Sequence, residues 1–496
     1  MASRTECALA FVAALAAGVA LPAAAAPPDT ITLGMVLEPP NLDPTSGAAA
    51  AVDEIVYANV FEGLTRMAAD GSVIPGLAES WESSEGGRVY DFHLRRGVTF
   101  HDGAGFTAED VVFTLDRARA EDSTNAQKVL FEGIETVEVL APDLARVILA
   151  APDGAFPWKM AWGDAVMVDE ASAATLATRP VGTGPFRFGE WRHGDRVTLT
   201  AFDGYWGDKP ALKAATFRFI ADPTAAFAAM MAGDVDAFPN YPAPETLAQL
   251  AADPRFRVLV GTTEGETILA LNNANPPLDN VRVREAIAHA VNRQEIIDGA
   301  MFGYGTPIGT HFAPHHPDHV DLTAWSAYDP AKARALLAGA GVAAPLRLRL
   351  ALPPPPYARR GGEIVASQLR AVGIETEITN MEWAQWLETV FKGGDFDMTI
   401  VSHTEPMDID VYGRKDYYFH YAHPDFVVLM DRLKATVDEA KRRALLRQAQ
   451  KMIAADYVNV FLFQLAKTGV ADARLEGLWL DAPNQSNDLT GVRWRM

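Results

Sequence analysis

Cysteine is almost absent from this chain of 496 residues, in which Cys7 is the only one. One cysteine cannot form a disulfide within the chain, and the region after residue 25 has no cysteine nucleophile. Positive charge is also scarce, because 43 Lys and Arg stand against 64 Asp and Glu and give a formal net charge of −21. Nucleic acids and anionic membrane surfaces repel such a chain, so we expect neither as a partner.

Long apolar runs are missing as well. After residue 26 no stretch reaches the roughly 18 consecutive apolar residues of a membrane-spanning helix, so direct membrane insertion is not expected. Apolar residues make up 49% and charged residues 22%, as in soluble globular proteins. The length exceeds what one hydrophobic core supports and predicts two or three domains.

Motifs of common enzymes and cofactor sites are not found. The sequence contains no H-E-x-x-H and no G-x-S-x-G, and Gly182-Thr183-Gly184 lacks the spacing of a phosphate-binding loop. We therefore predict no catalytic residue and no cofactor. A periplasmic hydrolase acting on peptides or sugars stays an alternative, because scattered catalytic residues leave no motif.

The first residues differ in composition from the rest. Arg4 precedes an Ala-rich apolar run from Ala8 to Leu21, and small residues follow up to Ala26. This pattern predicts a secretory signal peptide over residues 1–25, whose removal would take Cys7 with it. The residues before Cys7 do not match a lipoprotein cleavage site, so we expect a periplasmic protein without a lipid anchor.

Strand and helix periodicities alternate along the chain and predict an α/β fold. Leu346 to Leu352 alternates like a half-buried strand, and the apolar runs 396–401 and 458–463 predict buried strands. Apolar positions between Leu445 and Ile453 repeat with the helical period. The segment 107–110, Thr-Ala-Glu-Asp, predicts a capping box at the start of a helix.

Five segments, taken in order, resemble the family 5 extracellular solute-binding proteins, the dipeptide-, oligopeptide- and nickel-chelate-binding group of ABC importers. They include FHDG before the capped helix, VGTGPFRFGEW with GYWGDKP and MMAGDVDAF, and YDPAKARALLAGAG. The five segments span residues 77–117, 181–238, 269–308, 328–341 and 364–386.

The resemblance implies a two-lobed periplasmic binding protein fold with a hinge and a first lobe split into two domains. Domain I is expected at 26–50, 180–262 and 475–496, domain II at 51–179, and domain III, the second lobe, at 263–474. The hinge is expected at the crossings 261–270 and 465–474. A monomer of this kind would close over a small peptide-like ligand and deliver it to the transmembrane subunits of an ABC permease.

The resemblance also implies where the ligand binds. In peptide-binding relatives an acidic residue after the strand equivalent to 396–401 pairs with the ammonium group of the ligand, which selects Glu405 and Asp408 here. These acids stand where the family usually has glycine-aspartate and aspartate-proline, and solvated loop acids are the alternative. Trp383 and Trp386 are expected to offer indole faces, with ordinary core positions as their alternative. Asn41, in EPPNLDP, is the fifth candidate.

Four histidines lie close together in the segment HFAPHHPDH, and imidazole is a good ligand for zinc, copper and nickel. They are His311, His315, His316 and His319. Pro314 and Pro317 break any helical spacing between them, so no metal site is predicted, although a metal-chelate carrier stays an alternative. The preferred hypothesis is a carrier of a peptide or peptide-like amine. A sensor that docks on a chemoreceptor would leave the same sequence pattern.

Overall fold

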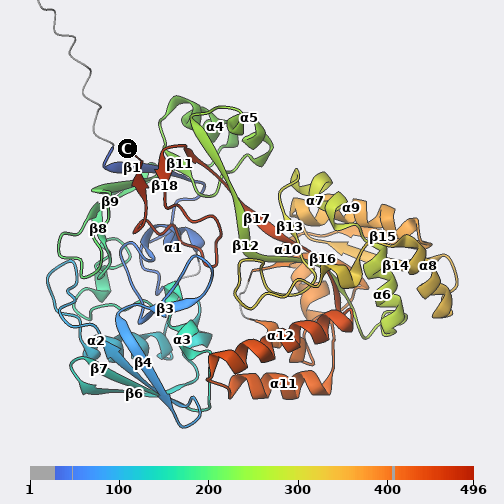
Figure 1. The fold of residues 1–496 in the computed structure, drawn as a ribbon, viewed down its shortest axis with the longest axis horizontal. Coiled ribbons are helices and arrows are strands. Elements are labelled where there is room, and N and C mark those ends of the chain that lie inside the picture. The colour runs from blue at the N-terminus through green and yellow to red at the C-terminus, as the bar shows by residue number, and fades with distance from the viewer. Residues whose placement is uncertain (1–27, 47–48, 405–407, 496) are drawn as a thin grey trace, which may run out of the picture.

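The computed structural model describes residues 28–46, 49–404 and 408–495, and the predicted α/β class is confirmed (Figure 1). Two lobes lie side by side, joined by two long strands that run from one into the other. The predicted signal peptide and Glu405 lie outside the described residues. Within the described part, no helix combines the length and the apolarity needed to cross a membrane.

The secondary structure elements follow one another in mixed order. The strands are β1 Thr30–Met35, β2 Thr65–Met67, β3 Val73–Pro75, β4 Ala78–Ser84, β5 Val89–Leu94, β6 Ile134–Ala141, β7 Leu144–Leu149, β8 Phe186–Arg192, β9 Arg196–Ala201, β10 Ala214–Phe219, β11 Ala237–Phe238, β12 Phe256–Leu271, β13 Thr306–Pro307, β14 Leu346–Leu352, β15 Ile374–Asn380, β16 Met398–His403, β17 Asn459–Asp472, β18 Leu475–Glu476 and β19 Arg493–Trp494. The α-helices are α1 Ala50–Val56, α2 Ala108–Arg119, α3 Phe156–Lys159, α4 Pro223–Ala232, α5 Leu247–Ala251, α6 Val281–Ala290, α7 Arg293–Met301, α8 Pro330–Gly339, α9 Pro356–Arg370, α10 Trp383–Trp386, α11 Pro424–Lys434 and α12 Glu439–Ala455. Short 3₁₀ turns are η1 Lys128–Leu130, η2 Gly163–Ala165, η3 Ala173–Thr175, η4 Pro244–Thr246, η5 Thr323–Ser326 and η7 Ile409–Gly413, and η6 Leu387–Lys392 is a π-helix.

One mixed sheet extends through both lobes. Its strand order is β15-β14-β16-β12-β17-β11-β1-β10-β9-β8, and β13 pairs with β17 beside this path. The first lobe carries β1 to β11 with β18 and β19, and the second carries β13 to β16 with α6 to α12. A separate antiparallel sheet, β4-β5-β7-β6, packs on α2 at the far end of the first lobe.

The connecting strands β12 and β17 pair along most of their length, with two register shifts, of which the larger lies between Thr262 and Glu266. Thr262 faces Ala466 and Glu266 faces Gln464, so residues 263–265 bulge out of the ladder. The side-chain amide of Gln464 holds the bulge by donating to the carbonyl of Thr263 at 2.7 Å. The bulge lies inside the crossing 261–270, where a hinge was expected, and the motion itself stays a prediction.

Local sequence rules account for several element boundaries. Thr107 and Asp110 form the predicted capping box of α2, which buries Val111 and Leu115. The strand predicted at 346–352 is β14. The apolar run 458–463 is only the first half of β17, because pairing with β12 and β11 carries this strand on to Asp472.

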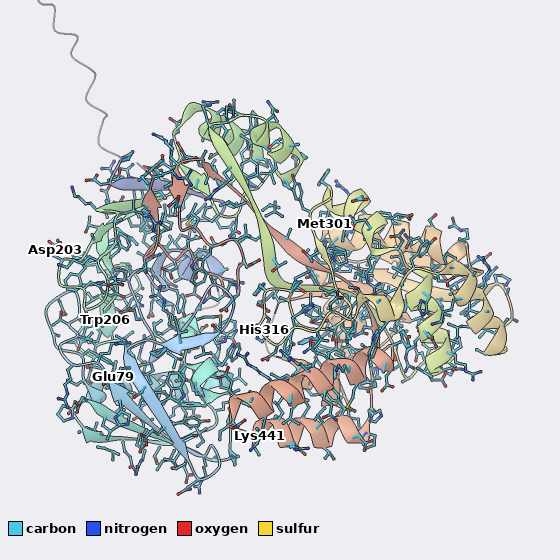
Figure 2. All side chains as sticks on the ribbon, in the orientation of Figure 1. Glu79, Asp203, Trp206, Met301, His316 and Lys441 are labelled. Carbon is cyan, nitrogen blue, oxygen red and sulfur yellow. The ribbon has the colours of Figure 1, made fainter. Side chains whose placement is uncertain are left out.

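A second contact joins the lobes away from the connecting strands. The backbone N–H of Gly154, just before α3, donates to the carbonyl oxygen of Lys434 at the end of α11, with 2.9 Å between the two atoms. A side chain on Gly154 would overlap the carbonyl of Thr436, so glycine is required for this approach. Figure 1 shows the α11–α12 hairpin reaching toward α3, and Figure 2 labels Lys441 near that end of α12.

We expect Gly154→Ala to separate the lobes at this contact. The variant loses a hydrogen bond worth about 1 kcal/mol and gains an overlap that costs about 1–3 kcal/mol. Small-angle scattering should show a larger radius of gyration than for the unchanged protein. Gly105→Ala is the matched control, because a Cβ there meets no atom within 4 Å. Identical scattering for all three proteins would mean that the contact does not set the distance between the lobes.

Candidate functional site

A cavity of about 1090 Å³ lies between the two lobes. The first lobe contributes residues from 49–54, 126–133, 149–164 and 482–486, together with Pro44, and the second contributes residues from 408–417 and 430–446, together with Thr404. The bulge residues 263–265 and Lys467 line it from the connecting strands. Pockets for small molecules usually enclose about 300–1,000 Å³, so this one is large for an ion and suits an organic ligand.

Charged side chains are frequent on the cavity wall. The described residues contribute Asp53, Glu54, Asp153, Asp164, Glu264, Asp408 and Asp410, together with Lys159, Arg414, Lys434, Arg442 and Lys467. Most of the carboxylates already have partners within the protein. Lys159 pairs with Asp153 at 2.7 Å and Arg414 pairs with Asp410 at 2.9 Å. Asn240 donates to the Glu54 carboxylate at 3.0 Å.

On the second-lobe side the buried His311 lies between two carboxylates. Its Nδ1 is 2.5 Å from Oε2 of Glu266, and its Nε2 is 3.0 Å from Oδ1 of Asp408. Burial alone would lower the pKa of His311, but the charge of Glu266 and hydrogen bonds to both acids raise it to about 10. With all three groups ionised, this triad carries one net negative charge, and Asp408 is its member on the cavity wall.

On the first-lobe side two carboxylates lie close together without a cation. Asp53 comes from α1 and is half-buried, whereas Asp164 comes from η2 and is only 7% exposed. The Asp53 carboxylate lies against Gly163, where a Cβ would be 2.5 Å from either carboxylate oxygen. Burial, followed by the charges of Asp164 and Glu54, raises the pKa of Asp53 well above its ordinary value. Burial also raises the pKa of Asp164 to about 7.

Residues 72–422 match the family model of the bacterial extracellular solute-binding proteins, family 5. This match extends over most of the chain. The chain belongs to family 5.

This family 5 chain is similar to the dipeptide-binding protein of Escherichia coli K12, with 30% identity over 76% of this chain and 78% of the relative. It is also 31% identical to the glutathione-binding protein GsiB of Pectobacterium atrosepticum, over 75% of this chain and 72% of the relative. The fold matches the structure of HbpA2 from Haemophilus parasuis with a TM-score of 0.86 and 23% identity, covering 94% of this chain and 100% of that one.

Of the described residues predicted from sequence to bind the ligand of this family 5 protein, one lines the cavity and others lie outside it. Asp408 lines the cavity, whereas Asn41, Trp383 and Trp386 do not. Trp386 is 3% exposed and donates its Nε1 proton to Oγ1 of Thr399 at 2.9 Å. Trp383 packs edge-on against Trp386 and is 40% exposed. Asn41 accepts a hydrogen bond from the backbone of Asp43, so its visible role is to shape a loop.

The four clustered histidines of the family 5 chain serve separate contacts. His315 bonds Thr262 and Glu264, at 2.6 and 2.7 Å. His316, labelled in Figure 2, stacks on Phe312, and burial lowers its pKa to about 3. His319 contacts the carbonyl of Phe312. No group of three or more potential metal ligands occurs among the described residues.

Asp164 yields a prediction about pH. A carboxyl group whose pKa is raised on folding binds its proton more tightly in the folded state, so folding stability falls as pH rises from 3.8 to about 7. Asp164→Asn removes this pH-dependent loss of folding stability, because an asparagine side chain does not ionise. We expect the variant to be about 1–2 kcal/mol more stable than the unchanged protein at pH 8, with a smaller gain at pH 5. Thermal melts at both pH values measure the difference, and a less stable variant at pH 8 would show that the protein favours the charged form.

Proposed function

We propose that this family 5 protein is the periplasmic substrate-binding component of an ABC importer and carries a peptide or peptide-like amine. The observation that carries the proposal is the cavity between the lobes, whose wall combines apolar, aromatic and charged side chains. The relatives that bind dipeptides and glutathione support a ligand of this class. Binding needs no chemical step, so the ligand is released unchanged and the protein is not an enzyme.

Export and delivery complete the proposal. Residues 1–25 act as a signal peptide, the mature chain is a monomer without a lipid anchor, and the closed form docks on the transmembrane subunits of the permease. The lobes are built from domain I (26–50, 180–262 and 475–496), domain II (51–179) and domain III (263–474). The bulge at 263–265 supports a hinge at the crossing of β12 and β17, because unpaired residues bend more easily than a continuous ladder.

In the cavity, the acidic segment after β16 holds the ammonium group of the ligand. Asp408 supports this role because it lines the cavity and ends a triad with one net negative charge. Glu405 is its partner in the proposal. Trp383, Trp386 and Asn41 would have to reach the ligand through a change in the arrangement of the lobes, since they do not line the cavity described above.

The test of this proposal measures both peptide binding and the change in the shape of the protein. Purified protein is screened against defined dipeptides and tripeptides by thermal melting, and hits are measured by calorimetry and small-angle scattering. A peptide at one hundred times its Kd should add about 2.7 kcal/mol of stability, and closure should reduce the radius of gyration. The same peptide should be recovered intact after incubation. Failure of every peptide to bind, or its cleavage during incubation, would refute this function.

A further inference from the structure

The acid pair Asp53 and Asp164 on the first-lobe wall has no role in the function proposed so far. The pair faces the cavity, on the other lobe from Asp408. Neither carboxylate forms an ion pair within residues 28–46, 49–404 and 408–495. The Asp164 carboxylate, in a residue more than nine-tenths buried, accepts hydrogen bonds from the backbone N–H groups of Asp164 and Gln127 but from no side chain of that part of the protein.

The nearby cations of the cavity wall are engaged elsewhere. Lys159 belongs to α3, the helix just before Asp164, but its ammonium group is bound to Asp153 at 2.7 Å. Lys467 donates to the carbonyl oxygen of Trp479 at 3.0 Å, and burial lowers its pKa to about 8. The protein therefore brings two carboxylates together in a poorly solvated place without supplying a positive charge. Such an arrangement is unfavourable for two ionised acids, and it is relieved either by a proton, as the raised pKa values show, or by a cation that binds from outside.

Two indoles stand next to the acids. Trp158 in α3 and Trp162 just before η2 line the same cavity, with ring centroids 5.4 Å apart and an angle of 75° between their planes. Indole faces attract cations through the quadrupole of the ring, and carboxylates form charge-assisted hydrogen bonds with ammonium and guanidinium groups. Acids and indoles on one wall favour an organic cation over a metal ion, because a metal ion would require more oxygen ligands.

We propose that Asp53, Asp164, Trp158 and Trp162 form a subsite for a second cationic group of the ligand. This inference rests on the proposed function, in which Asp408 and Glu405 take the first ammonium group. A ligand bound to both walls carries two positive charges, as a peptide with a lysine or arginine side chain does. The subsite thereby selects basic peptides, or diamines of similar length, from the wider class of peptide-like amines.

Matched peptides test the selectivity. Calorimetry compares three tripeptides of alanine with one lysine, at each position in turn, with the same peptides carrying norleucine, which has a similar length but no charge. At one position the lysine peptide should bind about 10- to 100-fold more tightly, the range expected for a hydrogen bond to a charged group. Asp53→Asn and Asp164→Asn should each remove most of this preference while the norleucine peptide keeps its affinity.

Glu54→Gln is the matched control, because it removes the same charge from the neighbouring residue, whose side chain is held by Asn240. The control should keep the lysine preference. If Glu54→Gln reduces the preference as much as Asp164→Asn does, the effect is general electrostatics and the subsite is refuted. Equal affinities for lysine and norleucine peptides at all three positions would refute it as well.

A small ammonium compound tests the subsite independently of peptide binding. Butylammonium chloride, with sodium chloride at equal ionic strength as the blank, should change tryptophan fluorescence in a saturable way. Asp164→Asn should abolish that change, with folding verified by thermal melt. A saturable response without any peptide binding would keep the subsite and refute peptide transport. Peptide binding with no butylammonium response, or a response unchanged in Asp164→Asn, would refute the subsite alone.

Discussion

Replacing His311 with glutamine is expected to lower the free energy of unfolding by about 3–5 kcal/mol. The imidazole lies between Glu266 and Asp408, both within 3.0 Å. Glutamine fills much of the same space but carries no charge, so two carboxylates with little access to water would face each other unpaired. Thermal or urea unfolding of the variant measures the loss. His193→Gln is the control, because the His193 side chain is 75% exposed.

The stability that His311→Gln loses should depend on pH in a defined direction. The pKa of His311 rises from its ordinary value of 6.5 to about 10 on folding, because the carboxylates outweigh the opposite effect of burial. The stabilisation by the charged imidazole is therefore complete below pH 6.5 and disappears as pH rises through about 10. The gap between the unchanged protein and His311→Gln should narrow between pH 7 and pH 10. A gap that stays constant over this range would show that His311 stabilises the protein as a neutral group.

Neutralising the acids after β16 is expected to weaken peptide binding by about two to four orders of magnitude. An ammonium group in a closed cavity needs an anionic partner, and removing that partner costs about 3–5 kcal/mol. Asp408→Asn leaves His311 paired with Glu266, so the fold should persist while the net negative charge of the triad is lost. Glu405→Gln tests the other candidate. Calorimetry with a peptide from the screen measures both affinities.

Asp410→Asn controls for charge on the same wall, because Asp410 also lines the cavity but is paired with Arg414. The affinity of the Asp410→Asn variant for the peptide should change by less than about tenfold, as expected when an exposed ion pair is lost. If both Glu405→Gln and Asp408→Asn bind the peptide with unchanged affinity, the ammonium group lies elsewhere. Family membership would be unaffected, since it rests on the match of residues 72–422.

The fold could be predicted from sequence to a large extent, because its elements follow local rules. The capping box at Thr107 and the alternation at Leu346–Leu352 each report on a few neighbouring residues, and both are confirmed. The strand boundaries at 396 and 463 were wrong, since pairing with distant strands decides where a strand begins and ends. Thus β16 begins at Met398, and β17 continues to Asp472.

The site was predicted less completely, because its contacts join distant segments. Asp408 was selected through the family resemblance, from its place after a strand, and it lines the cavity, while its role stays a prediction. Its pairing with His311 was not predicted, since nothing near either residue indicates the other. The histidines drew attention as a cluster, whereas the structure separates them into different contacts. Asp53 and Asp164 were missed, because each resembles an ordinary surface acid until α1 and η2 come together. The tryptophans of FPWKMAWGDA were the one local signal available.

The pairing of Thr262 with Ala466 means that the chain enters and leaves the second lobe at neighbouring points. The residues between these two points could be exchanged as one block by recombination at both points, either in evolution or in the laboratory. A chimaera built at these points would keep the acid pair Asp53 and Asp164 while receiving another relative's counterpart of Asp408. If these acids bind the ligand as proposed, the two walls can diversify independently, and a library of such chimaeras would sample their combinations without redesigning either core.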